Sequence, residues 1–204
     1  MDTSENSPEE LRQSLANRIE AAFVVDKPTW LQSLDAREQI FRRWAEDYSP
    51  RFAEVAKPLI YHQHPSDIPF DTLRLIEALK PGIWWNPYLN ETGYDYMLPI
   101  YLRGILLAPT ELDVAFEHWV DHLLPFDLSS DEISVSYEIR VSESVLKENL
   151  KDRSTRLKDY APQVREFIAE YFENFRAMYP HEMLSRQPKS LQLAEQFWRG
   201  IYLT

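Results

Sequence analysis

The chain has 204 residues, of which 44% are hydrophobic and 27% charged, and its formal net charge is −11. This length and composition are typical of one folded domain and exclude an intrinsically disordered chain. The absence of cysteine excludes disulfide bonds, thiolate nucleophiles and cysteine-based zinc sites. The four glycines are widely spaced, which excludes the glycine-rich loops that bind nucleotide phosphates.

Two further features bear on location. The first ten residues are acidic and polar and do not resemble a secretory signal peptide. An apolar stretch from Met97 to Ala108 is interrupted by Pro99 and Arg103 and is too short to cross a bilayer. Since cysteine-free chains suit a reducing compartment, we expect a cytoplasmic protein with no membrane contact.

The amino-terminal third of the chain predicts three helices. Residues 7–10 supply an N-cap serine, a proline at the first helical position and two acids at the positive helix end. Residues 35–38 form a variant of the capping box and predict a second helix start. Ser49 and Pro50 predict a third helix, which we expect to stop at Pro58.

The remaining helices follow in chain order. The middle of the chain predicts helices over residues 69–80, 100–107 and 111–124. Pro162 predicts the start of the strongest helix, which Pro180 ends, and another helix follows Pro188. The apolar face of the strongest helix consists of Val164, Phe167, Ile168, Tyr171, Phe175 and Met178. The expected core residues of the last helix are Leu191, Ala194, Phe197, Trp198 and Ile201.

One segment has the alternation of a strand instead. From Ile133 to Val141, apolar residues alternate strictly with polar ones, which predicts a half-buried strand. A strand needs a neighbour to pair its backbone groups, and the candidates within the chain, residues 22–25 and 59–61, are short. A small two-stranded ribbon is the favoured interpretation, and pairing with a second copy, which would give a homodimer, is the alternative.

These patterns together predict the fold class. We expect a mainly α, single-domain irregular bundle of about eight or nine helices over residues 1–204, with one small β element near residues 132–141.

The negative charge is concentrated in one part of the chain. Residues 104–139 hold eight acidic residues and no lysine or arginine. Residues 81–139, which we call the acidic segment, hold ten acidic residues and one arginine, so they carry nine of the eleven excess negative charges. Clustered negative charge attracts basic surfaces and repels nucleic acid and anionic membranes.

The same segment is rich in aromatic residues. Tyrosine and tryptophan are enriched at binding hot spots, although aromatics in such a stretch also commonly fill the core. The sequence therefore predicts a non-enzymatic, immunity- or antitoxin-like inhibitor that covers the basic surface of a partner such as a toxin nuclease, without a cofactor. The predicted partner-binding residues are Trp84, Trp85, Glu91, Tyr94, Asp95, Tyr96, Glu111, Asp113, Glu117 and Asp121.

Two alternatives remain open at this level. His118 and His122, at i and i+4, are spaced to chelate zinc or iron and would indicate a metal-dependent helical enzyme, with His62 and His64 as further ligands. Histidines at a helix flank are more often solvated, and the spacing is generic. The other alternative is a dimeric adaptor or chaperone that pairs through the strand from Ile133 to Val141.

Overall fold

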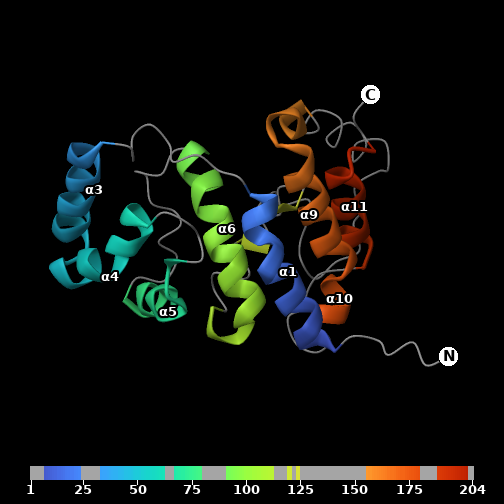
Figure 1. Cartoon of the computed structure of the whole chain (residues 1–204), viewed down its shortest axis with the longest axis horizontal. Coiled ribbons are helices and arrows are strands. Elements are labelled where there is room, and N and C mark those ends of the chain that lie inside the picture. The colour runs from blue at the N-terminus through green and yellow to red at the C-terminus, as the bar shows by residue number, and fades with distance from the viewer. Residues whose placement is uncertain are drawn as a thin grey trace, which may run out of the picture. The chain divides into compact units, whose positions relative to one another are not determined.

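The computed structural model confirms the mainly helical fold. The described residues form eight α-helices and two short 3-10 helices, and they include no strand (Figure 1). The predicted β element near residues 132–141, and with it the strand-mediated homodimer, lies outside these residues. The described residues are 7–23, 33–62, 67–79, 91–112, 119–120, 123–124, 155–179 and 188–201.

Residue contacts divide the chain into two compact units. Unit 1 comprises Met1–Leu15 and Val120–Thr204, and unit 2 comprises Ala16–Trp119. The single domain expected from the sequence stays a prediction, and each unit is described by itself. None of the helices in the described ranges combines the length and apolar character that crossing a membrane requires.

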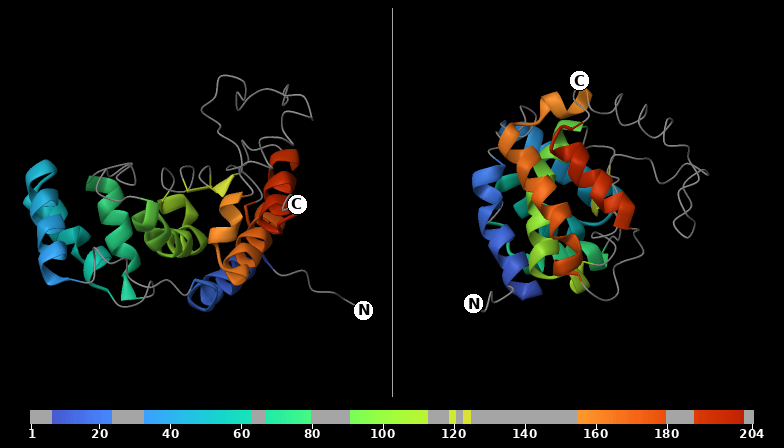
Figure 2. Two further views of the ribbon diagram at one scale, coloured as in Figure 1. Left: turned by 90° about the horizontal axis from the view of Figure 1, so that it is seen from above. Right: turned by 90° about the vertical axis from the view of Figure 1, so that its right-hand side faces the viewer.

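Unit 1 is built around two helices that pack against each other, α9 (Pro162–Glu173) and α11 (Pro188–Trp198). They lie side by side in every view (Figure 2). The other helical elements of the unit are the first half of α1 (Pro8–Ala22), η4 (Thr155–Asp159) and α10 (Phe175–Met178).

The start of α1 follows the sequence prediction. The Ser7 hydroxyl accepts a hydrogen bond from the Glu10 N–H at 3.2 Å, and the Glu10 carboxylate accepts one from the Ser7 N–H at 2.7 Å, which completes a capping box. The bond from the Ser7 N–H lowers the pKa of Glu10. Because the pKa is lowered in the folded state, this contribution to stability is present above the ordinary carboxyl pKa and is lost as the pH falls.

The strongest predicted helix is interrupted once. Its apolar face is buried along its full length, as expected, but Asn174 forms a turn that separates α9 from α10. The Asn174 side-chain amide donates to the Glu170 carbonyl at 2.9 Å, so a side chain occupies a backbone acceptor at the end of α9.

The prediction that Ile201 is a core residue is wrong. Helix α11 ends at Trp198, and Gly200 adopts a positive φ of 78°. The Gly200 N–H bonds the Phe197 carbonyl and the Ile201 N–H bonds the Gln196 carbonyl, the two bonds of a Schellman motif. This turn directs the chain away from the helix and leaves Ile201 60% exposed.

Unit 2 packs its helices in chain order. Helix α3 (Leu34–Asp47) packs on α4 (Pro50–Tyr61), α4 on α5 (Phe70–Leu79), and α5 on α6 (Glu91–Leu107), which η3 (Pro109–Glu111) follows. The core of this unit centres on α6, whose residues from Tyr96 to Leu102 are all buried.

Two prolines lie inside helices, where the sequence predicted helix boundaries. Helix α4 continues through Pro58 to Tyr61, and α6 begins at Glu91 and continues through Pro99. An interior proline costs about 3 kcal/mol because it removes one backbone hydrogen bond. Burial of apolar residues beyond each proline, including Leu59 and Ile60 in α4, offsets this cost. Residues 59–61 are therefore helical and are not a strand partner.

The N-cap of α3 differs from the prediction by two residues. The Ser33 hydroxyl accepts a hydrogen bond from the Ala36 N–H at 3.0 Å, so the cap is Ser33, and Asp35 lies in the first turn. We expect Ser33→Ala to lower the free energy of unfolding by about 1 kcal/mol. Asp35→Ala should cost only about 0.5 kcal/mol, the loss of a charge near the helix dipole. Urea denaturation of both variants checks this, and a larger loss for Asp35→Ala would contradict the assignment.

Helices α5 and α6 approach each other closely at Gly104. A Cβ atom built on Gly104 would lie 2.7 Å from Leu73 Cδ1 and 2.8 Å from Leu112 Cδ1. Because Gly104 has no side chain, Leu73 of α5 and Leu112 can pack on this face of α6.

Candidate functional site

Helix α6 contains four of the predicted partner-binding residues in its first two turns, and Tyr96 is the one whose side chain the structure describes. Glu91, Tyr94 and Asp95 belong to this helix, and for them the structure describes the backbone alone. The helix starts nine residues before the predicted start at Ile100. An acidic residue at a helix start is favourable because the amino-terminal end carries partial positive charge.

Tyr96 is not part of an exposed surface. Its side chain is 5% exposed, and its hydroxyl lies 3.1 Å from Nε2 and 3.2 Å from Nδ1 of His62. Burial raises the pKa of the Tyr96 hydroxyl, and the nearby charge of Arg37 lowers it in part. The structure thus places Tyr96 in the core of unit 2, and its predicted role in partner binding stays a prediction.

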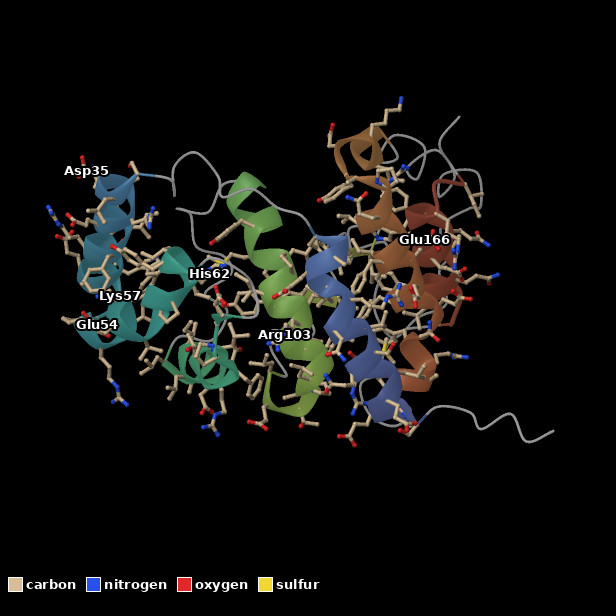
Figure 3. All side chains as sticks on the ribbon, in the orientation of Figure 1. Asp35, Glu54, Lys57, His62, Arg103 and Glu166 are labelled. Carbon is tan, nitrogen blue, oxygen red and sulfur yellow. The ribbon has the colours of Figure 1, made fainter. Side chains whose placement is uncertain are left out.

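His62 is also committed to internal contacts. It lies at the end of α4 (Figure 3) and is buried, and its Nδ1 lies 2.9 Å from the Pro58 carbonyl oxygen. A carbonyl oxygen only accepts, so Nδ1 carries the proton and Nε2 is the acceptor for the Tyr96 hydroxyl. Neither nitrogen is directed to solvent, which disfavours His62 as a metal ligand.

Among the predicted binding residues whose side chains the structure describes, Glu111 lies at the surface. It is half exposed, and its carboxylate lies 3.9 Å from Arg74. Arg74 makes a shorter ion pair, 3.0 Å, with Asp71 in the same helix. Because exposed ion pairs at the longer distance contribute about 1 kcal/mol or less, Glu111 can exchange Arg74 for an external cation at little cost.

The carboxyl-terminal end of the predicted helix 111–124 is held inside unit 1. Val120, Leu123 and Leu124 are buried, and the Leu124 N–H bonds the Val120 carbonyl at 3.2 Å, which closes one helical turn. The indole N–H of Trp198 donates a buried 2.8 Å hydrogen bond to the Leu123 carbonyl. The sequence identified Trp198 only as a core residue, because an indole partner cannot be inferred from helical spacing.

An arginine next to Trp198 fixes the end of α11. Arg199 contacts Glu166 at 2.9 Å, Glu173 at 2.6 Å and Glu195 at 3.0 Å. Glu166 and Glu173 belong to α9, so one guanidinium joins the two main helices of unit 1. The hydrogen bond to Glu195 is the largest cause of a raised pKa of Arg199. The charge of Glu166, the hydrogen bond to Glu166 and the charge of Glu173 raise this pKa further.

The hairpin of α3 and α4 carries cations that stack on aromatic rings. Arg37 lies 5.5 Å and Lys57 5.9 Å from the centroid of the Tyr61 ring, and Lys57 also lies 5.4 Å from that of Phe41. Such contacts contribute about 0.5–1 kcal/mol at exposed sites. The i, i+4 spacing of Lys57 and Tyr61 in the sequence would have been the signal for them.

Three of the four predicted metal ligands cannot be placed, and their role stays a prediction. His64, His118 and His122 lie outside the described residues. Among the residues described, no group of three or more histidine, aspartate or glutamate side chains converges in a way that could hold a metal ion. Trp84, Trp85, Asp113, Glu117 and Asp121 also lie outside the described residues, so their predicted role in binding stays a prediction.

Comparison with protein-family models, with curated proteins and with solved structures finds no match to this chain. The functional argument therefore uses the charges and contacts of this chain alone.

Proposed function

We propose that the protein is a binding protein that uses its acidic segment to cover a basic surface of another protein. The observation that carries this proposal is the distribution of charge, because nine of the eleven excess negative charges lie within residues 81–139. Such a concentration speeds association with a basic partner and disfavours nucleic acid.

The ratio of acids to basic residues in the segment supports this proposal. The segment itself supplies ten acids and one arginine. Most of its negative charge therefore has no cation nearby in the sequence and is suited to pairing with a cationic partner.

The chemistry of such a partner follows from the charge. An enzyme that binds phosphate groups presents clustered lysines and arginines, and carboxylates can occupy the positions of those phosphates. An inhibitor of a basic enzyme, such as an immunity protein for a toxin nuclease, is the function that fits this segment.

The test is a charge reversal with a control of equal charge. The variant Asp113→Lys, Glu117→Lys, Asp121→Lys changes the net charge by +6 within the segment. The control Glu46→Lys, Glu54→Lys, Asp159→Lys makes the same change at three exposed residues outside it. Calorimetry with a ten-residue arginine peptide at two salt concentrations measures the affinity.

We expect the segment variant to bind the peptide at least about tenfold more weakly, with a smaller salt dependence. The control should lose much less affinity, because its charges are distant in sequence from the segment. Equal losses in the two variants would show that net charge alone determines binding, and the proposal would then be wrong.

A further inference from the structure

Arg103 is the only lysine or arginine of the acidic segment, and it lies on α6 (Figure 3). The residues before and after it in this helix, from Tyr96 to Leu102 and from Gly104 to Leu106, are all buried. Arg103 itself is only partly buried, so its side chain has access to solvent. The structure therefore places a single cation on an otherwise buried stretch of helix.

The guanidinium of Arg103 has no hydrogen bond or ion pair with any residue in the described ranges. Arg12, which is also partly buried, shows the contrast: it donates to the Met178 carbonyl at 2.6 Å and lies 5.8 Å from the centroid of the Tyr179 ring. A guanidinium keeps its proton in proteins, so Arg103 cannot lose its charge. A charge that is partly removed from water without a partner is costly, and binding of an anion removes this cost.

The helix itself supplies no counter-charge to Arg103. The positions that share its face, three and four residues away on either side, are Pro99, Ile100, Leu106 and Leu107. The first three are buried and Leu107 is partly buried. Apolar neighbours reduce the screening by water, which strengthens a hydrogen bond between a guanidinium and an anion.

We propose that Arg103 is a binding residue for one carboxylate group, to which its guanidinium donates two parallel hydrogen bonds. A carboxylate carries one negative charge, which one guanidinium neutralises. A phosphate carries up to two, and the ten acids of the segment would repel the excess charge. The inference does not rest on the proposed function, because it concerns an anion and one described side chain.

The first experiment is a titration of the full chain with propionate at constant ionic strength, followed by NMR at the arginine Nε–Hε groups. We expect a dissociation constant of about 10–50 mM at Arg103, the affinity of one charge-assisted pair. Arg51, an exposed residue of α4, is the control in the same spectrum and should bind at least about fivefold more weakly. Inorganic phosphate should also bind Arg103 more weakly than propionate. Equal affinities for propionate at Arg103 and Arg51 would overturn the inference.

A second titration distinguishes a free carboxylate from the side chain of a protein partner. The probe is a peptide of one glutamate between two pairs of alanines, with both ends blocked. Binding that is tighter than that of propionate indicates a glutamate or aspartate of a partner protein as the ligand. Binding that is equal or weaker indicates a free monocarboxylate. If neither probe shifts the Arg103 resonance, the inference is wrong.

The third experiment measures stability, which separates a binding role from a structural one. Arg103→Met keeps an unbranched apolar side chain and removes the charge. We expect it to lose the response to propionate and to raise the urea midpoint by about 0.3–0.5 M, because a charge without a partner is removed. Arg51→Met, the matched exposed control, should change the midpoint by about 0.2 M or less. A lower midpoint for Arg103→Met would show that the guanidinium is already paired within the chain, and would overturn the inference.

Discussion

Replacing Phe175 with alanine should destabilise unit 1 by about 3–5 kcal/mol, the range measured for buried phenylalanines. Phe175 is 0% exposed and lies at the centre of an aromatic cluster. Its ring centroid is 5.6 Å from that of Tyr171, 6.3 Å from that of Phe172 and 4.9 Å from that of Tyr179. Alanine would remove these contacts and leave a cavity. A loss of this size is a large fraction of the 5–15 kcal/mol of stability that is typical of a domain.

The neighbouring residue provides the control. Arg176 is in the same four-residue helix, α10, and is exposed. Arg176→Ala should change the free energy of unfolding by about 0.5 kcal/mol or less, as is usual for surface positions. Urea denaturation followed by circular dichroism measures both variants. A loss below about 1 kcal/mol for Phe175→Ala would mean that the cluster is not packed as described.

Replacing Gly104 with leucine should destabilise unit 2 by about 1–3 kcal/mol, the usual cost of overpacking. Even a Cβ at this position would lie closer to Leu73 and Leu112 than real side chains approach each other. Alanine adds the Cβ alone and gains about 1 kcal/mol of helix propensity, so its net effect should be small. The three further carbons of leucine have no space between α6 and α5.

A double-mutant cycle tests whether the contact with Leu73 causes this cost. Leu73→Ala alone should be destabilising, since Leu73 is buried. In combination with Gly104→Leu, the total loss should be smaller than the sum of the two single losses, because the new side chain fills the vacated volume. Additive losses would show that the two helices do not meet at this point.

Helix starts and core faces were predicted well because they depend on local chemistry. The Ser-Pro pairs at residues 7–8 and 49–50 begin helices as expected, and the Ser49 hydroxyl accepts from the Phe52 N–H at 3.0 Å. The apolar spacing of α9 predicted which of its residues are buried. These signals operate within one helical turn, so the sequence contains them in full.

Helix ends were predicted less well because they depend on burial by distant residues. Pro58 and Pro99 are valid stop signals for an isolated helix, but packing against neighbouring helices outweighs their cost. The start of α6 was missed for the same reason. Ile201 was assigned to the core because the helical period was extended past Gly200, where the backbone reverses.

The candidate site was predicted from charge and residue type, and these do not specify burial. Tyrosine is a residue type that is common at binding surfaces, but Tyr96 lies in the core, where its hydroxyl is hydrogen-bonded to His62. Trp198 was predicted to be a core residue, and its indole N–H also donates to the Leu123 carbonyl within the acidic segment. Hydrogen bonds between residues 75 positions apart leave no pattern in a single sequence.

The order of synthesis has a consequence for unit 1. The Arg12 guanidinium donates a 2.6 Å hydrogen bond to the Met178 carbonyl, so the first helix completes a contact with a residue made 166 positions later. A ribosome adds about 5–20 residues per second, so Arg12 waits roughly 8–30 s for this acceptor. During that time the apolar residues of the first half of α1, such as Leu15, lack their native neighbours in unit 1. The first half of α1 is therefore accessible to chaperones, and to aggregation, until the end of the chain is made.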